Sequence, residues 1–537
     1  MSREFTNKLV GYINSGFQAI QVDTPEITRA ENAVRDAADR VGMSVFTWDI
    51  ANGFADDPGG DHKNPAQALD RVASTAEGNG VYIFRNFHVF LRDPVIAQKW
   101  QLLVEQNMLN NASYTRPIII LGTNVEMPKM LKATTTTIEF ALPTRDELSG
   151  CFDFIQQGAI DANPDQQDNA ACDSEQKDKI VGSLLGLSAQ DAENTLSLCA
   201  HQHRGFRSAG LLTTIEDEKA QILKRSAGLE YISKDKIPPI ADVGGFDLAK
   251  EWIQQRTVCF TPAAEEFHLD PLQGIVLLGV PGTGKSLCGK AIARVLDLPL
   301  IIADISSVFG SLVGQSEKQA SDMLSTINSI GSGVVLFDEA DKMFGGAAEA
   351  SGDSGVTRRI FGKILTWLQE GKAPNIFVVM TMNRIKGIPP EFLRKGRFDE
   401  VFYTDLPDEN ERKAILEIHM RKRNIESPAD VLDESEWAEI IKATKDFVGA
   451  ELEDVVKAAK LLAFTSRESH VPKFDEMIKV IKETRTMATL DKENIDAIRQ
   501  FCTERARPVS SSIAAKIQKS EQSGKSGKRG SRGLSWD

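Results

Sequence analysis

Short apolar runs alternate with helical patterns over residues 1–150. Five runs have the length and composition of buried β-strands, and they cover residues 17–22, 44–49, 80–86, 116–123 and 136–142. Amphipathic helical patterns separate most of these runs, as in residues 26–42 and 93–109. This alternation is typical of a doubly wound sheet, in which helices cover the faces of parallel strands. We therefore predict an α/β domain over residues 1–150.

The pattern changes after this first domain. Residues 151–236 are polar with helical periodicity, which continues to residue 232 and predicts a helical lid or connector. Strands and helices alternate again in residues 237–400, with apolar runs at 275–280, 299–305, 333–339 and 376–383. Residues 401–507 are largely helical in pattern and predict a second lid. The tail, residues 508–537, is rich in serine, glycine and lysine without periodicity, which predicts disorder.

Composition excludes several classes of protein. The chain has 537 residues, enough for about three or four domains. It carries 63 lysines and arginines against 76 aspartates and glutamates, and the net charge of −13 argues against a general nucleic-acid binder. No apolar run approaches the roughly 20 residues that span a bilayer, and the N-terminus lacks a signal-peptide layout. The six cysteines show no C-x-x-C spacing, so we expect no zinc site, no disulfide and a location in the reducing cytoplasm.

The run Ile275–Ser286, IVLLGVPGTGKS, has the sequence of a phosphate-binding loop. An apolar strand candidate leads into a glycine-rich turn, and a helical pattern begins at Lys285. Glycine is needed in such a turn because backbone N–H groups must approach phosphate oxygens closely, where a Cβ atom would clash. Lys285 can reach the β- and γ-phosphates, and the Ser286 hydroxyl can ligate Mg²⁺. The loop therefore predicts a nucleotide-binding protein.

Two acidic residues, Asp338 and Glu339, follow the third apolar run of this domain. Asp338 can hold Mg²⁺ through water, and Glu339 can orient or deprotonate an attacking water. Acidic pairs at strand ends are common, but a pair that follows a phosphate loop in the same domain indicates hydrolysis. Asn383 ends the next apolar run and can polarise the same water through its amide, although a turn-forming role is equally compatible.

Two arginines, Arg394 and Arg397, stand near the end of this domain in the sequence LRKGRFDE. A guanidinium near the γ-phosphate stabilises the charge that develops during phosphoryl transfer. The alternative is a salt bridge on the surface, and the spacing alone leaves both roles open.

The first α/β domain has the pattern of a degenerate copy of the second. With Pro25 opposite Pro281, residues 20–34 match the phosphate-loop region, with Arg29 facing Lys285 and none of the loop glycines. VYIFRNF then matches VVLFDEA, LGTNVEMP matches MTMNRIKG, and FALPTRDEL matches TDLPDENER. Four matches in the same order indicate an internal duplication, although any α/β sheet shows a comparable rhythm. In either case the first half lacks the residues for phosphate and Mg²⁺ chemistry.

These motifs together resemble the AAA ATPases of the katanin, spastin and proteasome-ATPase type. The resemblance is carried by GVPGTGKS, VVLFDE, the MN pair at residues 382–383, LRKGRFDE, LPDENER and FVGAEL at residues 447–452. The chain is most similar to an AAA family encoded in red-algal plastid and cyanobacterial genomes, first named as a hypothetical chloroplast reading frame. Residues 237–465 carry this similarity strongly and residues 1–236 more weakly. It implies a P-loop NTPase (AAA+) fold with a helical lid, preceded by a degenerate P-loop-like domain, and the plastid stroma as the location if the gene is plastid-encoded.

The resemblance also implies roles for the matching residues. Asp338 and Glu339 would form the Walker B motif, and Asn383 would be sensor 1. Arg394 and Arg397 would be arginine fingers that reach the γ-phosphate of a neighbouring subunit, which implies a homo-oligomeric, hexameric ring. The residues that would contact ATP are Asp242, Val243, Gly244, Gly279, Val280, Pro281, Gly282, Thr283, Gly284, Lys285, Ser286, Leu287, Gly449 and Ala450. The first three of these would flank adenine, the last two would lie near the base and ribose, and Ser286 with Asp338 would hold Mg²⁺.

One position departs from the pattern of the family. Threading rings carry an aromatic residue just before the V-G of a substrate-gripping pore loop, where this chain has Leu312, with Phe309 three residues earlier. A leucine offers less area for gripping, so we expect modest remodelling of a protein partner in place of processive unfolding. Two functions are compatible with these features: an ATP-driven remodeller of a protein that the sequence does not identify, and a nucleotide-dependent assembly switch with low turnover. A DNA-handling loader fits less well, because the acidic chain offers no basic groove.

Overall fold

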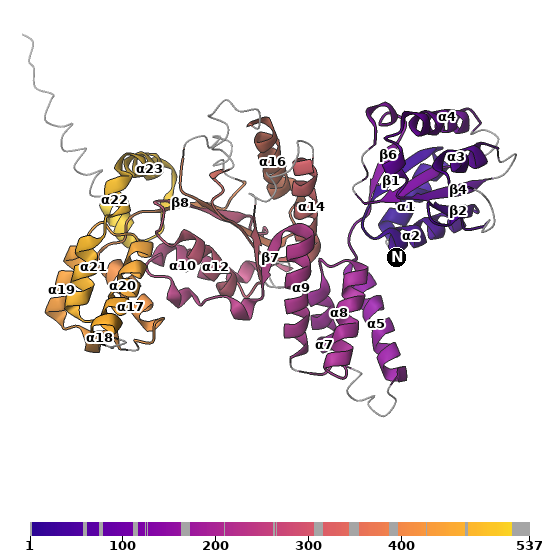
Figure 1. Cartoon of the computed structure of the whole chain (residues 1–537). Helices are drawn as coiled ribbons and strands as arrows, with labels where there is room; N and C mark the ends of the chain where they lie inside the picture. The colour runs from indigo at the N-terminus through magenta and orange to yellow at the C-terminus, as the bar shows by residue number, and fades with distance from the viewer. Residues whose placement is uncertain are drawn as a thin grey trace, which may run out of the picture. The chain divides into compact units, whose positions relative to one another are not determined.

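The computed structural model describes residues 3–56, 62–74, 79–110, 116–123, 125, 127–162, 172–208, 210–260, 264, 266–304, 315–342, 354–385, 396–425, 427–467 and 471–517. The chain divides into two compact units, Met1–Glu218 and Lys219–Asp537. Each unit contains one mainly parallel sheet and a group of helices, coloured in Figure 1 from indigo to yellow along the sequence. Within the described residues, none of the helices has the length and apolar character needed to cross a membrane.

The first unit contains a six-stranded sheet in the order β3-β2-β4-β5-β1-β6. Its strands are β1 (Ala19–Asp23), β2 (Ser44–Asp49), β3 (Gly53–Phe54), β4 (Gly80–Arg85), β5 (Ile118–Gly122) and β6 (Thr136–Glu139). All neighbouring strands are parallel except β2 and β3. The five strands predicted from the apolar runs are confirmed. Only β3 was missed, because two residues are too short for a periodic pattern.

Helices pack against both faces of this sheet. Their bounds are α1 (Arg3–Asn14), α2 (Ile27–Arg40), α3 (Pro65–Ser74) and α4 (Pro94–Asn110). Val81 and Ile83 of β4 lie in one apolar core with α1 and α2, whereas Tyr82 and Phe84 lie in another with α3 and α4. This is the alternation that a strand buried on both faces requires. The helices that follow the sheet are α5 (Arg145–Ala162), α7 (Ser174–Leu184), α8 (Ala189–Gln202) and α9 (Leu211–Ala227), the last of which crosses the boundary between the units.

The second unit contains a seven-stranded sheet in the order β13-β12-β8-β11-β10-β9-β7. Its strands are β7 (Leu229–Ile232), β8 (Gly274–Gly279), β9 (Leu300–Ala303), β10 (Ser332–Phe337), β11 (Asn375–Met382), β12 (Glu400–Thr404) and β13 (Arg507–Pro508). All neighbouring strands are parallel except β7 and β9. The central strands β8, β10 and β11 are almost entirely buried, which explains their continuous apolar sequences.

Two groups of helices accompany the second sheet. The first group is α10 (Asp247–Gln254), α12 (Lys285–Val295), α14 (Gln315–Ile330) and α16 (Ser354–Thr366), which a π-helical turn extends over Trp367–Gly371. The second group is α17 (Glu409–Arg421), α18 (Pro428–Val431), α19 (Glu434–Ala443), α20 (Gly449–Arg467), α21 (Phe474–Glu483), α22 (Met487–Leu490) and α23 (Lys492–Arg505). Short 3₁₀ turns cover Phe87–Phe90, Lys129–Leu131, Lys234–Lys236, Ile240–Asp242 and Thr257–Phe260. Helices α17, α19, α20 and α21 share an apolar core of their own, as a lid does.

Three segments differ from the sequence-based expectations. The helical pattern expected to reach residue 232 ends at Ala227, because Gly228 adopts a left-handed conformation (φ 64°) and β7 follows. Residues 401–507 do not begin with a helix, since β12 completes the sheet beside β8. The tail expected to be disordered from Pro508 is ordered to residue 517, and residues 518–537 lie outside the described residues.

The C-terminal segment is ordered because it packs on distant parts of the second unit. β13 pairs with β12, and the side chains of Val509 and Ile513 are buried in the main core, each 3% exposed. The N–H groups of Leu248 and Ala249 donate to the carbonyl of Val509 at 3.0 and 3.1 Å. The Ser511 N–H also donates to Asp247 Oδ1, at 3.0 Å, so the segment is tied to the start of α10.

The two sheets share one strand order. In each sheet, five parallel strands can be numbered by their order along the chain, and their order across the sheet is then 5-1-4-3-2. These strands are β6-β1-β5-β4-β2 in the first sheet and β12-β8-β11-β10-β9 in the second. Just beyond the third of these strands, two residues at matching positions in VYIFRNF and VVLFDEA also have a left-handed backbone, Asn86 with φ 54° and Glu339 with φ 51°. Because non-glycine residues seldom adopt this conformation, the shared feature supports the internal duplication.

Removing the C-terminal segment should destabilise the second unit. A chain that ends at residue 506 loses the buried side chains of Val509 and Ile513, each worth about 1.5–3 kcal/mol. We expect its second unit to lose roughly 3–6 kcal/mol of unfolding free energy in calorimetry. A chain that ends at residue 517 is the control and should unfold like the full chain. Equal unfolding temperatures for the 506 and 517 chains would show that the segment contributes no stability.

Candidate functional site

The glycine-rich turn joins β8 to α12 at the carboxyl edge of the second sheet, where the parallel strands end. Gly279, Gly282 and Gly284 have φ angles of 151°, 75° and 91°, which residues with a Cβ atom rarely adopt. A Cβ atom at Gly279 would lie 2.0 Å from the carbonyl oxygen of Thr404, and one at Gly282 would lie 2.9 Å from Val448 Cγ2. Both the backbone conformation and the close neighbours therefore require glycine here.

Lys285 begins α12, and its side chain is buried against the turn. Its Nζ donates to the carbonyl oxygens of Gly279 at 3.0 Å and Val280 at 2.6 Å. Burial lowers the pKa of Lys285 to about 8, an effect that the nearby carboxylates of Asp341 and Asp338 oppose. The amino group therefore lies against the carbonyl oxygens at the start of the loop.

Ser286 and Asp338 meet at the carboxyl edge of the sheet. Asp338 follows β10, and its Oδ1 accepts a hydrogen bond from Ser286 Oγ at 2.6 Å. A hydroxyl and a carboxylate are oxygen ligands of the kind that Mg²⁺ prefers, usually together with waters and phosphate oxygens. In the described part of the chain, no group of three or more His, Cys, Asp or Glu side chains could hold a metal by itself. The pair therefore fits a Mg²⁺ ion that nucleotide phosphates help to bind.

Glu339 and Asn383 lie at the same edge, at the ends of neighbouring strands. The Glu339 carboxylate is partly exposed and forms an ion pair with Lys342, one helical turn further on. The N–H of Asn383 donates to Asp341 Oδ1 at 3.0 Å, which ties the end of β11 to the residues after β10. The structure thus brings the two acidic residues and the asparagine beside the glycine loop.

The residues expected around the base and ribose also approach the loop. The 3₁₀ turn Ile240–Asp242 contacts α12. Gly244, just after it, packs on α17, where a Cβ atom would lie 2.5 Å from Ile415 Cγ1. The N–H of Ala450, at the start of α20, donates to the carbonyl oxygen of Gly282 at 3.0 Å. A Cβ atom at Gly449 would lie 3.2 Å from that same oxygen. The remaining loop residues are Val280, Pro281 and Thr283 in the turn and Leu287 in the first turn of α12.

Arg397 lies away from the glycine loop of its own chain. Two residues later, Asp399 accepts hydrogen bonds from the N–H groups of Gln273 and Gly274 at 2.8 Å each, where β8 begins. The loop follows the other end of β8, and six residues at about 3.3 Å each put roughly 17 Å between the two ends. Arg394, Leu312 and Phe309 lie outside the described residues.

The sequence analysis missed two residues of the site, Thr381 and Asp341. Thr381 is buried in β11 at 1% exposure, and its hydroxyl contacts both Asp338 and the backbone of Glu339. Asp341 is buried at 8% exposure and accepts the bond from Asn383. The sequence does offer one signal for Thr381, which is a hydroxyl within the otherwise apolar run of β11. A buried hydroxyl needs a hydrogen-bond partner, so this residue could have been expected to bond a neighbouring polar group.

In the first unit, internal ion pairs occupy the carboxyl edge of the sheet, the edge that corresponds to the candidate site of the second unit. Arg29, in the place of Lys285, pairs with Glu26 and also with Glu147 at 3.3 Å. Glu26 is buried, which raises its pKa, and its Oε1 accepts the N–H of Ala189 at the start of α8 at 2.6 Å. The arginine and the start of this helix are therefore both engaged by carboxylates of the same unit.

In the first unit, a second ion pair stands where the second unit has its candidate Mg²⁺ ligand, Asp338. Arg85, in the place of Asp338, donates through Nε to Glu31 Oε2 at 2.7 Å. The other oxygen of Glu31 accepts from Arg35 Nη2 at 2.6 Å and from Thr47 Oγ1 at 3.0 Å. Burial alone would raise the pKa of Glu31, but the bonds from the two arginines lower it. Among the residues that the structure describes at this edge, Arg85 and Glu31 thus bond each other where the second unit has its candidate Mg²⁺ ligand.

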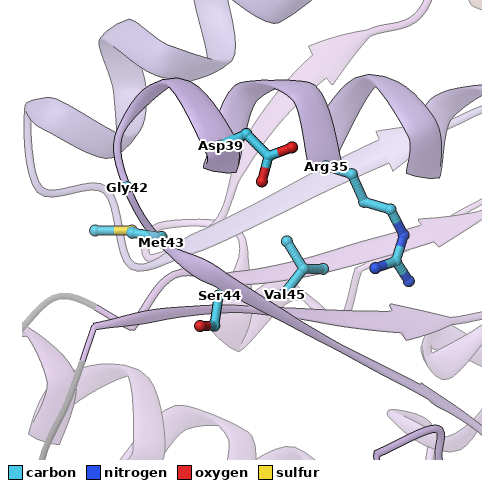
Figure 2. A pocket seen from close by; sticks show the side chains of 6 residues that line it. All are labelled: Arg35, Asp39, Gly42, Met43, Ser44 and Val45. Carbon is cyan, nitrogen blue, oxygen red and sulfur yellow. The ribbon is translucent and has the colours of Figure 1, made fainter.

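A hollow of about 390 Å³ opens elsewhere in the first unit, lined by Arg35, Asp39, Gly42, Met43, Ser44 and Val45. Figure 2 shows these residues where α2 ends and β2 begins, at the amino end of that strand. In open α/β sheets, ligands bind beyond the carboxyl ends of the strands. The hollow is therefore distinct from the candidate site and contains none of the residues predicted from the sequence.

Models of three protein families match the chain. The SpoVK-like AAA ATPase, N-terminal domain, matches residues 5–140, and the SpoVK-like AAA ATPase, second domain, matches residues 155–226. The ATPase family associated with various cellular activities (AAA) matches residues 275–406, which include the glycine loop and Asp338. These matches cover the first sheet, most of the helices that follow it, and strands β8 to β12 of the second sheet.

Similar proteins occur in algae and archaea. The AAA domain-containing protein ycf46 of Pyropia yezoensis is 31% identical over 513 residues, which cover 94% of this chain and 99% of that protein. The ycf46 protein of Guillardia theta is 30% identical over 501 residues, covering 91% of this chain and 93% of that protein. The Cell division cycle protein 48 homolog of Archaeoglobus fulgidus is 31% identical over 229 residues, 41% of this chain and 30% of that protein. The chain therefore belongs to the AAA ATPase family and is similar over nearly its whole length to the ycf46 proteins.

Proposed function

We propose that the chain binds ATP with Mg²⁺ at the glycine loop of the second unit and hydrolyses it. The observation that carries this proposal is the hydrogen bond between Ser286 and Asp338, which joins the loop to the acidic end of β10. Lys285 would contact the phosphates, and the turn at residues 242–244 with the start of α20 would enclose the base. Bound Mg²⁺ would neutralise part of the phosphate charge. Asp338 and Ser286 would hold and orient that ion.

Hydrolysis needs a group that acts on water, and we assign this role to Glu339. The carboxylate stands beside Asp338 at the end of β10, and Asn383 at the end of β11 would help to hold the water in line. The ion pair with Lys342 engages the same carboxylate. The Lys342 side chain is largely exposed and that of Glu339 is partly exposed, and such pairs contribute little to stability. Glu339 is therefore able to leave Lys342 when substrate binds.

We further propose that the chain works as a homo-oligomeric ring, hexameric by family resemblance, that remodels a protein partner. The placement of Arg397 supports this, because its backbone lies at the opposite edge of the sheet from its own glycine loop. An arginine there acts on ATP only if the ATP belongs to a neighbouring subunit. The first unit, whose matching edge is closed by ion pairs, would then recognise the partner.

A nucleotide-dependent assembly switch with low turnover is the second candidate. It would follow if the ion pair between Glu339 and Lys342 persisted in the ATP-bound chain, since a carboxylate held by lysine does not activate water. ATP turnover that rises when the partner is added would support the remodeller. Assembly that depends on ATP, with negligible turnover, would support the switch.

Two substitutions should separate ATP binding from hydrolysis. Lys285→Ala removes a contact to ground-state phosphates, so we expect about 100-fold weaker ATP binding. Glu339→Gln removes only the group that acts on water, so ATP binding should change less than about threefold while turnover falls about 100-fold or more. Calorimetry and steady-state phosphate release measure the two effects, and Lys290→Ala, on the same helix, is the control. Turnover at the wild-type rate in Glu339→Gln would refute the role assigned to this residue.

Mixed oligomers test whether Arg397 acts between subunits. Arg397→Ala chains should be weak ATPases alone, because every site then lacks this arginine. Mixing them with Lys285→Ala chains should restore part of the activity, since some interfaces combine an intact loop with an intact arginine. The measurement is phosphate release from oligomers in which both chains are shown to be present. An absence of recovery in such oligomers would favour a finger that acts within its own subunit.

A further inference from the structure

Thr381 lies where the two strand ends of the candidate site meet. It is the last but one residue of β11, and only 1% of its surface is exposed. Its Oγ1 accepts the N–H of Glu339 at 2.9 Å and donates its own hydrogen to Asp338 Oδ1 at 2.5 Å. A hydroxyl has one hydrogen and two lone pairs, so both bonds form at once. One side chain thus contacts both acidic residues of the site.

The bond to Asp338 fixes the orientation of that carboxylate. Ser286 Oγ also donates to Oδ1, so two hydroxyls converge on the same oxygen from two elements of the fold. In the described residues, the hydrogen bonds found for this carboxylate all fall on Oδ1. The other oxygen, Oδ2, therefore remains available to accept from a water bound to Mg²⁺.

The bond to Glu339 supports a strained backbone. Glu339 has φ 51°, a left-handed conformation that is sterically unfavourable for a non-glycine residue. Its N–H is held by Thr381 Oγ1, and the next N–H, of Ala340, donates to the Thr381 carbonyl oxygen at 2.9 Å. The conformation turns the chain sharply at the end of β10 and thereby sets the direction of the Glu339 side chain.

The first unit provides an internal comparison. Asn86 has the same left-handed backbone as Glu339, and its N–H donates to the carbonyl oxygen of Leu121 at 2.7 Å. Leu121 and Gly122 end β5, the strand that matches β11, and neither carries a hydroxyl. The left-handed residue therefore does not need a threonine at the position of Thr381, where the first unit has Gly122 in the match of LGTNVEMP with MTMNRIKG. At this position, the unit with the two carboxylates has the hydroxyl and the other unit does not.

We propose that Thr381 is a positioning residue for the Mg²⁺ and water sites. Its hydroxyl holds Asp338 in the orientation that binds the ion and holds the backbone of Glu339 so that the carboxylate faces the water. This inference rests on the proposed function, because it assigns Thr381 to the same site. Residues that orient metal ligands in this way typically change metal affinity or activity by about 10- to 100-fold when substituted.

The test compares Thr381→Val, which keeps the shape and removes the hydroxyl, with Thr381→Ser, which keeps the hydroxyl. In the full chain loaded with ATP, we expect Thr381→Val to weaken Mn²⁺ affinity, measured by electron paramagnetic resonance, by about 10-fold or more. Turnover at saturating ATP should fall by about 10- to 100-fold, while ATP affinity without metal stays within about threefold. Thr381→Ser should restore metal affinity and turnover to near the wild-type values.

A matched control removes a buried hydroxyl elsewhere in the same unit. Thr444, at the end of α19, is fully buried and its hydroxyl donates to the backbone carbonyl of Ile440. Thr444→Val should leave Mn²⁺ affinity and turnover unchanged. Wild-type Mn²⁺ affinity in Thr381→Val, or equal losses in Thr381→Ser, would overturn the inference. A wild-type chain without turnover would contradict the proposed hydrolysis, whereas the Mn²⁺ measurement would still decide the role of Thr381.

Discussion

The parallel pairing of β8, β11 and β10 is the constraint on which the candidate site depends. Because these strands run in one direction, their carboxyl ends meet at one edge and bring together groups far apart in the sequence. The glycine loop leaves β8 and the acidic pair leaves β10, and the Ser286 hydroxyl links the two through Asp338. Thr381 links the end of β11 to the same acidic pair through its hydroxyl. A register shift in any of these strands would separate Ser286 from Asp338, since a one-residue slip turns every side chain to the other face.

The same scaffold carries different chemistry in the two units. Five parallel strands have the same order in both sheets, and a left-handed residue lies at matching positions just beyond the third of them, Asn86 and Glu339. In the second unit this edge holds glycines, a buried lysine and carboxylates, whereas in the first Arg29 and Arg85 are engaged by Glu26 and Glu31. Function therefore follows the residues at the edge and not the fold. Internal ion pairs occupy the position in the first unit where the second has its candidate nucleotide site.

Much of the fold and of the site could be predicted because short stretches of sequence determine these features. Buried parallel strands are continuous apolar runs, and the glycine spacing of the loop reflects backbone angles that other residues avoid. The rest depends on partners distant in the sequence. Val509 and Ile513 are isolated apolar residues among serines, and only their contacts with the core order the tail. The partners of the Thr381 hydroxyl and the distance of Arg397 from its own loop likewise follow from strand pairing, which a single sequence does not display.

The central claim is that ATP binds at the glycine loop of the second unit and meets an arginine of a neighbouring subunit. A cryo-electron microscopy reconstruction of the Glu339→Gln chain with ATP and Mg²⁺ tests it most directly. The account predicts a nucleotide between the loop, the turn at residues 242–244 and the start of α20, with Arg397 of the adjacent subunit facing the γ-phosphate and no nucleotide in the first unit. A nucleotide bound in the first unit, or a loop of the second unit left empty at saturating ATP, would contradict it.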